Sequence, residues 1–301
     1  MTESASLRRV SNIGLFRTFV RELITFSQTD RVPEPDLVMD DPAKVEAFTR
    51  AGDEDGVMAP VYLHHCAHIC SIVRPGDTVV DLGCGSARQI AMAARLNPDT
   101  RFLGVDLSDE MLDRARDHAA QQNLNNLDFT VGDITKLDAF DDDSVDAVVS
   151  TVALHQLPDV GMFRATLQQA GRVLKPGGGI YIVDFARLKS LRSIAYFAHQ
   201  YEGSQPELFT EDYYNSLRAA FSLAEWRAAA ADFLGGAGRL YATPVIRFMV
   251  AIKSPERCTD DGRLRGELAA IRARLPEHHK VDLKNLLGFF KGGGLRNTLL
   301  A

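Results

Sequence analysis

Short apolar segments alternate with longer amphipathic segments through the middle of the chain. The short segments have the length and the branched apolar residues of β-strands, whereas the longer ones repeat apolar residues at helical spacing. Such alternation predicts crossover connections and a mostly parallel sheet with helices on both faces. The expected strands are 78–82, 101–105, 128–131, 147–150, 180–185 and 246–252, and the expected helices between them are 86–96, 108–123 and 158–173.

Helical segments also flank this core at both ends. Residues 1–75 are expected to form an N-terminal cap, because the apolar stripe 13–24 has helical spacing and Asp41-Pro42 is a suitable helix start. Residues 254–301 are expected to form a C-terminal extension of two helices. From Lys253 onward the chain has ten basic and six acidic residues, so this tail either complements an acidic body or binds a polyanion.

A further helical segment is expected at 186–235, inside the 76–253 core and before its last strands. Ser222 and Glu225 have the spacing of a capping box, which favours a helix there. Nine of the 24 aromatic residues fall within 186–233, either as the core of the extra helices or as the wall of an apolar pocket. They are Tyr196, Phe197, Tyr201, Phe209, Tyr213, Tyr214, Phe221, Trp226 and Phe233.

Composition narrows the class of protein. With 301 residues, 46% hydrophobic and 25% charged, the chain is expected to be globular. It has no charge-free apolar stretch of about 18 residues, so no transmembrane helix is expected, and Glu3, Arg8 and Arg9 interrupt any secretory signal. The net charge of −6 argues against a nucleic-acid partner. We therefore expect a cytoplasmic protein that does not associate with membranes, with terminal segments compatible with a homodimer.

The chain has four cysteines, too few for a disulfide scaffold. Two of them lie near two histidines in the segment from Leu63 to Cys70. On a helix, His64 and His68 share one face, while Cys66 and Cys70 point roughly 200° away, so the four cannot reach one tetrahedral zinc ion. We interpret the segment as a buried helix and expect no metal site. Trivalent arsenic bound by the two cysteines is the alternative.

A glycine-rich turn follows the first expected strand, in Asp81-Leu82-Gly83-Cys84-Gly85. Glycine suits a turn that needs an unusual backbone conformation and a close approach of the ligand. A dinucleotide-binding fingerprint would have its third glycine at residue 88, which is Arg88. A pyrophosphate cofactor such as NAD is therefore the weaker alternative.

Acidic residues stand at the ends of the next two expected strands. Asp106 follows Gly85 by 21 residues, the distance at which doubly wound folds place an acid on ribose hydroxyls. Asp133, in Gly132-Asp133-Ile134, puts another carboxylate at the end of the third strand. Three neighbouring strand tips of this kind predict one crevice for a nucleoside.

With Gly104-Val105-Asp106-Leu107-Ser108 and Leu174-Lys175-Pro176-Gly177-Gly178, these motifs resemble those of the class I S-adenosylmethionine-dependent methyltransferases. The resemblance covers residues 75–185 and the strand at 246–252. It implies a Rossmann-like, doubly wound, seven-stranded, mostly parallel sheet. It also implies an enzyme that uses S-adenosyl-L-methionine as methyl donor and leaves S-adenosyl-L-homocysteine.

The resemblance further assigns residues to each part of the donor. Asp81 and the backbone of Gly83, Cys84 and Gly85 would hold the methionine part, Asp106 the ribose, Leu107 and Met111 the adenine, Asp133 the adenine amino group, Ile134 the ring, and Ser150 and Thr151 would line the sulfonium site.

On the acceptor side the expectation is a small, partly apolar organic molecule. His155 follows the fourth strand and is the candidate general base, although a histidine there also serves packing. The candidate substrate contacts are Tyr62, His65, Tyr201 and Tyr213. The alternatives are an RNA or protein methyltransferase and a non-catalytic regulatory protein that binds S-adenosylmethionine.

Overall fold

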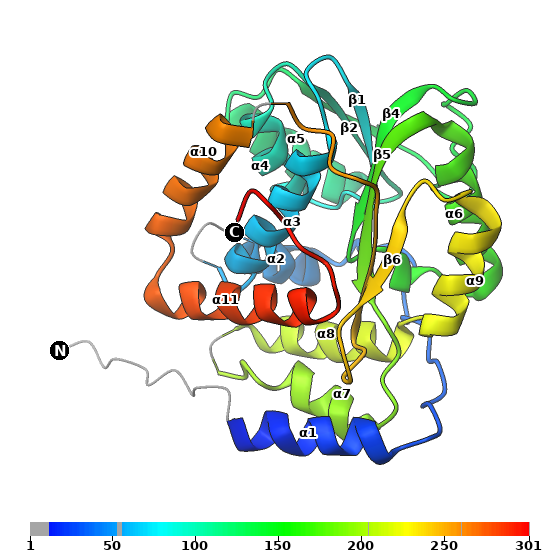
Figure 1. Cartoon of the computed structure of the whole chain (residues 1–301), viewed down its shortest axis with the longest axis vertical. Helices are drawn as coiled ribbons and strands as arrows, with labels where there is room; N and C mark the ends of the chain where they lie inside the picture. The colour runs from blue at the N-terminus through cyan, green and yellow to red at the C-terminus, as the bar shows by residue number, and fades with distance from the viewer. Residues whose placement is uncertain (1–11, 53–55, 204, 260, 301) are drawn as a thin grey trace.

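The computed structural model describes residues 12–52, 56–203, 205–259 and 261–300, so residues 1–11 of the expected cap lie outside the described part. Its centre is a seven-stranded sheet (Figure 1). The strands are β1 (Thr78–Leu82), β2 (Arg101–Asp106), β3 (Leu127–Val131), β4 (Val145–Thr151), β5 (Leu174–Phe185), β6 (Arg239–Ala242) and β7 (Met249–Lys253). Their order in the sheet is β3-β2-β1-β4-β5-β7-β6, and only β7 runs antiparallel to its neighbours. This topology confirms the predicted doubly wound, mostly parallel sheet.

Helices cover both faces of the sheet and one of its ends (Figure 1). On one face lie α3 (Ala59–Ile72), α4 (Arg88–Leu96) and α5 (Asp109–Gln121), with α10 (Asp261–Arg274) and α11 (Glu277–Gly292) packed against α3. On the other face lie α6 (Val160–Val173) and α9 (Leu223–Phe233). At the end lie α1 (Asn12–Ile24), α2 (Pro42–Ala51), α7 (Leu191–Ala198) and α8 (Glu207–Ala219). The two faces carry separate hydrophobic cores.

The helix starts follow the expected local chemistry. The Asp41 side chain accepts hydrogen bonds from the backbone N–H groups of Ala43 and Lys44 and so caps α2. Ser222 and Glu225 form the predicted capping box at the start of α9. Both caps join residues within three positions of each other, so the sequence alone was enough to predict these helix starts.

Two features of the last strands differ from the expectation. The short strand β6 was not located from the sequence, because its residues are exposed or only half-buried and form no apolar run. The final strand begins at Met249 rather than at 246. Thr243 explains the difference: its hydroxyl donates to the carbonyl oxygen of Ile246 (2.7 Å) and accepts from the N–H of Met249 (3.2 Å), which holds a turn there.

The apolar stripe of α1 forms the predicted helix but faces outward. Ile13, Phe16, Leu23 and Ile24 are each between 59% and 65% exposed, whereas Glu22 is 2% exposed. A single sequence shows that a helix is amphipathic, yet not which face a neighbour covers. Here the helix packs against α7 with its smaller, more polar side.

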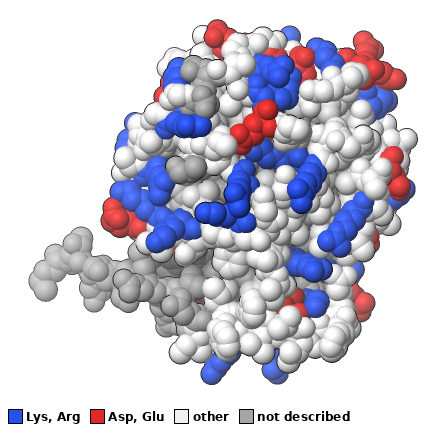
Figure 2. Space-filling model, viewed as in Figure 1, with Lys and Arg blue, Asp and Glu red and all other residues white. Residues whose placement is uncertain are grey.

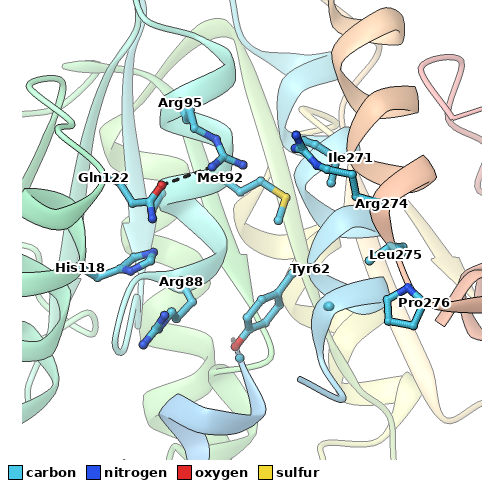
Figure 3. A pocket seen from close by; sticks show the side chains of 13 residues that line it. Tyr62, Arg88, Met92, Arg95, His118, Gln122, Ile271, Arg274, Leu275 and Pro276 are labelled. Atoms are coloured by element: carbon cyan, nitrogen blue, oxygen red, sulfur yellow. Dashed lines mark hydrogen bonds between the residues drawn. The ribbon is translucent and has the colours of Figure 1, made fainter. Parts of the chain in front are cut away.

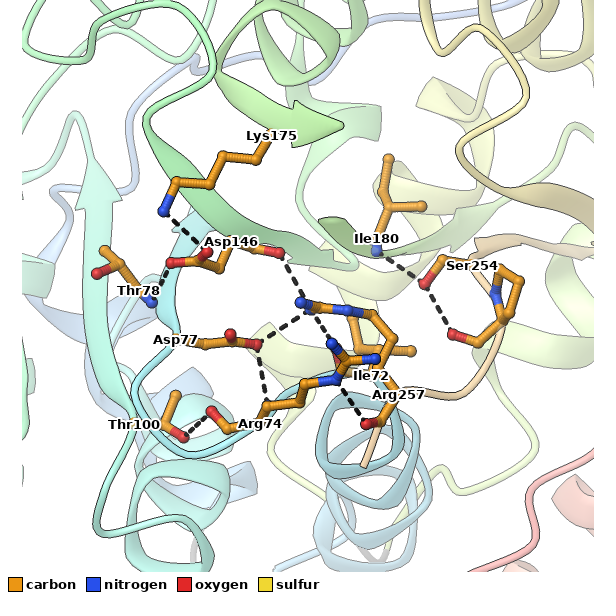
Figure 4. A network of polar contacts seen from close by, with 11 residues as sticks. Ile72, Arg74, Asp77, Thr78, Thr100, Asp146, Lys175, Ile180, Ser254 and Arg257 are labelled. Atoms are coloured by element: carbon orange, nitrogen blue, oxygen red, sulfur yellow. Dashed lines mark hydrogen bonds and ion pairs between the residues drawn. The ribbon is translucent and has the colours of Figure 1, made fainter. Parts of the chain in front are cut away.

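Charged groups are closely paired at the amino-terminal edge of the sheet (Figure 4). Arg257 Nη1 donates to the carboxylate of Asp77 (3.0 Å) and to the carbonyl oxygens of Ile72 (2.9 Å) and Asp146 (3.1 Å). The Asp146 carboxylate accepts from Lys175 Nζ (2.8 Å). The Arg257 and Asp77 side chains are only 12% and 10% exposed. This network fixes the start of the C-terminal extension to the starts of β1 and β4.

Within the described ranges, none of the helices combines the length and the apolar character needed to span a membrane.

Candidate functional site

The turn after β1 requires glycine at two positions. Gly83 and Gly85 have φ angles of +72° and +52°, in the region that side chains rarely adopt. A Cβ on Gly83 would also lie 2.6 Å from the Cβ of Ala153, which follows β4. The turn therefore approaches the end of β4 closely, at the carboxyl ends of the strands where the donor crevice is predicted.

Asp106, at the end of β2, holds this turn in place. Its Oδ2 accepts the N–H of Gly85 (2.8 Å), and its Oδ1 accepts the N–H of Ser108 (3.0 Å). Burial raises the pKa of Asp106, and the backbone donors oppose that effect. Each carboxylate oxygen has more than one lone-pair site, so Asp106 can still accept hydrogen bonds from a ligand.

Asp81, at the end of β1, is the unusual group of the crevice. Its side chain is 4% exposed, and Oδ1 has no hydrogen-bond partner among the described residues. Burial, with a smaller contribution from the negative charge of Asp106, raises the pKa of Asp81 to about 7. An orphaned buried carboxylate oxygen is costly, and a cationic ligand group would remove that cost.

The other expected donor contacts lie around the same strand tips. The Gly132 N–H donates to the Asp106 carbonyl oxygen (2.9 Å), which joins the ends of β2 and β3. Ile134 and Met111 are buried. The Asp133 carboxylate already accepts from Thr135 and pairs with Lys136 (2.9 Å). Burial alone would raise the pKa of Asp133, but these bonds outweigh burial and lower it.

Ser150 and Thr151 lie at the end of β4, next to β1. The Ser150 hydroxyl donates to the Leu82 carbonyl oxygen (2.7 Å), so it joins the two strands that carry the crevice. Cys84 faces β2, because a Cβ on Gly104 would lie 2.6 Å from its Sγ. The Cys84 thiol is therefore turned toward β2, which leaves only its backbone for the donor contact that the family resemblance implies.

Residues 38–48 cross this crevice from outside the sheet. The Ser108 hydroxyl donates to the Asp40 carboxylate (2.6 Å) and also lies 3.1 Å from the Met39 carbonyl oxygen. In α2, the Phe48 ring comes within 4.0 Å of the Cβ position of Gly85. The N-terminal helical segment thus covers the tips of β1 and β2.

His155 sits on a short 3-10 helix, Leu154–Gln156, directly after β4. It is 3% exposed, and its Nδ1 lies 2.8 Å from Oδ1 of Asp184 on β5. The other Asp184 oxygen accepts the backbone N–H of His155 (2.9 Å). Asp184 therefore fixes the ring orientation and favours a proton on Nδ1, which leaves Nε2 as the nitrogen that can accept a proton.

Further acids surround Nε2 of His155. Glu34 Oε1 lies 3.8 Å from Nε2 and accepts the hydroxyl of Ser216 (2.8 Å). Burial raises the pKa of Glu34 and of Asp212, and the His155 charge opposes both shifts. Burial alone would lower the pKa of His155, but Asp184, followed by Glu34 and Asp212, outweighs burial and raises it.

Arg31 fastens the segment that carries Glu34. It donates to the carbonyl oxygens of His155 (3.0 Å) and Ala219 (2.7 Å), and its guanidinium lies 4.1 Å above the ring centre of Phe221. A small cavity of about 30 Å³ remains beside Glu34. It is lined by Glu34, Pro35, Asp36, Val38, Met39, Asp40, Asp41, Lys44, Gln156 and Asp212.

The four expected substrate contacts are dispersed. Tyr213 contacts Phe185, whose ring in turn contacts His155, so it lies near the candidate base. Tyr201 donates to Asp282 of α11 (3.2 Å). Tyr62 lines a separate groove beside α4. The structure does not place the fourth, His65, at the crevice: His65 is buried against Tyr181 and Phe290.

The histidine and cysteine segment of α3 is part of the core. His64 stacks on Phe290 and His68 on Tyr181. Cys66 and Cys70 are fully buried with their sulfur atoms 3.9 Å apart. No group of three or more His, Cys, Asp or Glu residues in the described part is arranged to hold a metal ion.

Sequence reasoning missed Arg31, Glu34, Asp184 and Asp212. A signal existed for Asp184, because it ends an apolar strand as Asp81 and Asp106 do. Arg31 and Glu34 reach His155 across more than 100 positions, and Asp212 is 57 positions from it. No local pattern marks such contacts.

A family model described as a methyltransferase domain matches residues 74–220, which include the strand tips and His155. This match spans just under half of the chain, and with the strand-end motifs and the sheet order it agrees with the class I S-adenosylmethionine-dependent methyltransferases. The predicted resemblance is thereby confirmed.

The relatives match this chain over part of its length, and their names refer to different methyl acceptors. The chain is 35% identical over 111 residues to an arsenite methyltransferase of Halobacterium salinarum, covering 36% of this chain and 27% of that protein. It is 34% identical over 113 residues to a demethylmenaquinone methyltransferase of Listeria monocytogenes, covering 37% and 46%. The chain thus spans less than half the length of these relatives.

One solved structure supports the fold. A structure described as an S-adenosyl-L-methionine-dependent methyltransferase of Methanococcus maripaludis aligns with a TM-score of 0.53 and 16% identity. The alignment covers 77% of this chain and 100% of the other.

Proposed function

We propose that the protein transfers a methyl group from S-adenosylmethionine to a small, partly apolar organic acceptor that loses a proton. The single observation that carries the donor assignment is the buried Asp81 Oδ1, which has no hydrogen-bond partner among the described residues. The amino acid part of S-adenosylmethionine ends in an ammonium, which suits this oxygen. The ribose hydroxyls suit Asp106, which has acceptor sites beyond its two backbone bonds.

The bound donor would supply an electrophilic methyl group on a sulfonium. The contribution of the protein is to align the acceptor with it and to exclude water, and alignment alone lowers a barrier by as much as about 7–11 kcal/mol. The segment at 38–48 and helix α8, which packs against α2 and the 3-10 helix of His155, are placed to provide this cover.

His155 is the proposed base. Asp184 holds Nδ1, so Nε2 is the atom that would take the proton from an acceptor hydroxyl. In this structure Glu34 Oε1 lies 3.8 Å from Nε2, and the 30 Å³ cavity on the side of Glu34 is too small for an organic acceptor. The acceptor is therefore proposed to enter by displacing the segment that carries Glu34.

The acceptor class is supported by the aromatic side chains near His155 and by the names of the curated relatives. Phe185 and Tyr213 lie next to the imidazole and offer an apolar wall. One of the relatives is named for an organic acceptor, demethylmenaquinone. The other relative is named for arsenite. In this chain Cys66 and Cys70, the cysteines that could bind trivalent arsenic, are fully buried in the hydrophobic core around α3.

The function is tested by incubating the protein with tritiated S-adenosylmethionine and separate acceptors: an aromatic alcohol, an aliphatic amine, arsenite and transfer RNA. We expect S-adenosylhomocysteine to form with the aromatic alcohol. Product formed only with arsenite or only with RNA would refute the proposed acceptor class. Binding of the donor without turnover on any acceptor would instead support the regulatory alternative.

The role of His155 predicts a specific pH profile. The charges of Asp184, Glu34 and Asp212 raise the pKa of His155, so the neutral, basic form increases as the pH rises through that pKa. Glu34→Gln removes one raising charge, and we expect the acidic limb of the kcat/KM profile, which reports the free enzyme, to move to lower pH. The matched control Asp36→Asn lines the same cavity without being among the charges that shift His155. An identical shift in both variants would argue against His155 as the base.

A further inference from the structure

Helix α1 is the outermost helix at one end of the molecule (Figure 1). The side that it turns toward α7 is small and polar, since Thr18 and Glu22 are buried there. A Cβ on Gly14 would lie 2.7 Å from the Tyr196 ring of α7, so the two helices approach closely. The Glu22 carboxylate also accepts the backbone N–H of Lys189 (3.1 Å). These contacts hold α1 with its opposite side toward the solvent.

That outward side of α1 is apolar. Its residues recur at helical spacing, so they form one strip along the 13 residues of the helix, a length of about 20 Å. Phe26, just after the helix, is 96% exposed. An exposed apolar surface of this extent marks a place of interaction. The strip consists of Ile13, Phe16, Phe19, Val20, Leu23 and Ile24, each at least 37% exposed.

The charges beside the strip are basic. Arg17 and Arg21 are one helical turn apart on the same flank of α1, whereas its single acid, Glu22, is turned inward. Helix α7 begins with an exposed leucine and an exposed arginine, Leu191 and Arg192. Four arginines and two glutamates give residues 1–24 a charge of +2, against −6 for the whole chain.

The strip is a ridge rather than a hollow. Neither the outer groove beside α4 that Tyr62 lines (Figure 3) nor the cavity beside Glu34 includes a residue of α1. Figure 2 shows the end of the molecule that carries α1 as largely uncharged, with basic side chains at its lower margin. A ridge of this kind does not enclose a small ligand, but it fits an extended surface.

We propose that α1 lies in the surface layer of a membrane that contains anionic lipids. An interfacial helix buries its apolar side about 5–10 Å deep among headgroups and acyl chains, and basic residues on its flank attract the anionic headgroups. The sequence expectation of no membrane contact rested on spanning segments, and a helix in the plane of the surface needs none. The proposal does not depend on the proposed methyl transfer.

A second copy of the chain is the competing occupant of the strip. In a two-fold symmetric contact the same surface meets itself, so Arg17 and Arg21 of both copies would enter one interface. Glu22 is not available to pair with them, because it is buried and bound to Lys189. Charge therefore favours an anionic lipid surface over self-association.

The test is co-sedimentation of the full chain with lipid vesicles. One set contains phosphatidylcholine alone, and the other an equimolar mixture of phosphatidylcholine and phosphatidylserine. We expect the chain to bind the mixture at least about tenfold more tightly than phosphatidylcholine alone, and added salt should weaken this binding. Phe16→Ser/Leu23→Ser should weaken binding to the mixture by about tenfold or more, because apolar area is lost. Arg17→Gln/Arg21→Gln should weaken it by about fivefold per arginine.

Two matched controls remove similar side chains elsewhere. Val160→Ser/Val281→Ser changes two exposed apolar residues on α6 and α11, and Arg272→Gln/Arg274→Gln changes two exposed arginines on the basic C-terminal extension. Both controls should bind the mixture as the parent does. All four variants should keep the melting temperature of the parent, because each change is made at the surface.

The proposal is overturned if the parent does not bind the mixed vesicles. It is also overturned if the arginine control on α10 loses as much binding as the α1 arginine variant, since the basic extension would then be the lipid-binding element. Sedimentation velocity without vesicles tests the competing occupant. A parent dimer that Phe16→Ser/Leu23→Ser converts to a monomer, without vesicle binding by either, would assign the strip to a second copy of the chain.

Discussion

The two edges of the sheet differ in whether the aspartates beside β1 have a cationic partner. At the amino-terminal edge, Asp77 and Asp146 are paired with Arg257 and Lys175 (Figure 4). At the carboxyl-terminal edge, Asp81 keeps one oxygen without a partner in the described part of the chain, and the pKa of Asp81 and of Asp106 is raised by burial. Because a buried charge is costly unless paired, the first arrangement serves the fold, and the second fits our proposal that Asp81 meets a cationic group of the methyl donor.

The largest expected effect is on turnover, and it concerns the pair of His155 and Asp184 at the carboxyl-terminal edge, whose proposed role is catalytic. Asp184→Asn keeps the size of the side chain but no longer favours the Nδ1 proton of His155. If the proposed mechanism holds, kcat should fall by about 10³–10⁴-fold. In a catalytic triad, the same change from aspartate to asparagine favours the wrong histidine tautomer and has an effect of this size. The measurement is S-adenosylhomocysteine formation with the accepted substrate. Donor affinity should change little, and a loss of donor binding equal to the loss of turnover would assign Asp184 to the fold instead.

At the opposite edge the expected effect is on stability. Arg257→Met leaves Asp77 buried without its cation and removes two bonds to carbonyl oxygens. Breaking a buried pair in this way costs about 3–5 kcal/mol of unfolding free energy, measured by urea denaturation. The exposed pair of Arg164 with Asp232 provides the control, since Arg164→Ala should cost less than about 1 kcal/mol. Equal costs would remove the distinction between the two kinds of pair.

A smaller effect is expected on the affinity for the donor product, S-adenosylhomocysteine. Asp106→Ala removes a charged acceptor from the crevice, and S-adenosylhomocysteine affinity should fall by about 1.5–3 kcal/mol in calorimetry. Asp113→Ala, in an exposed ion pair on α5, should not change that affinity. An unchanged affinity in Asp106→Ala would remove Asp106 from the site.

The donor half of the site was predictable because its signals are short. A strand followed by Gly83 and Gly85, then acids at the next strand ends, is a pattern of contiguous residues, and the sheet order brings those ends together. The covering half was not predictable in the same way. Glu34 meets His155 across 121 positions, and the packing that brings them together has no local signature.

Side-chain type also proved a weak guide to position. His65 and Tyr62 lie on the same helix before the turn, yet one is buried beside Tyr181 and the other lines the outer groove. The α1 stripe formed its helix but turned outward, because burial depends on which neighbour is available. Periodicity therefore predicted the elements better than it predicted their environments.

The central claim is that the Asp81 carboxylate binds the ammonium group of the methyl donor. It is tested most directly by proton release on ligand binding. At pH 7, near the pKa of about 7, roughly half of the Asp81 population is protonated before binding. The ammonium of S-adenosylhomocysteine favours the ionised carboxylate and lowers that pKa, so protons leave. Titration calorimetry at pH 7, in buffers of different ionisation enthalpy, should therefore show release of about half a proton per ligand, lost in Asp81→Asn. Binding with no proton release and with equal affinity in Asp81→Asn would contradict the claim.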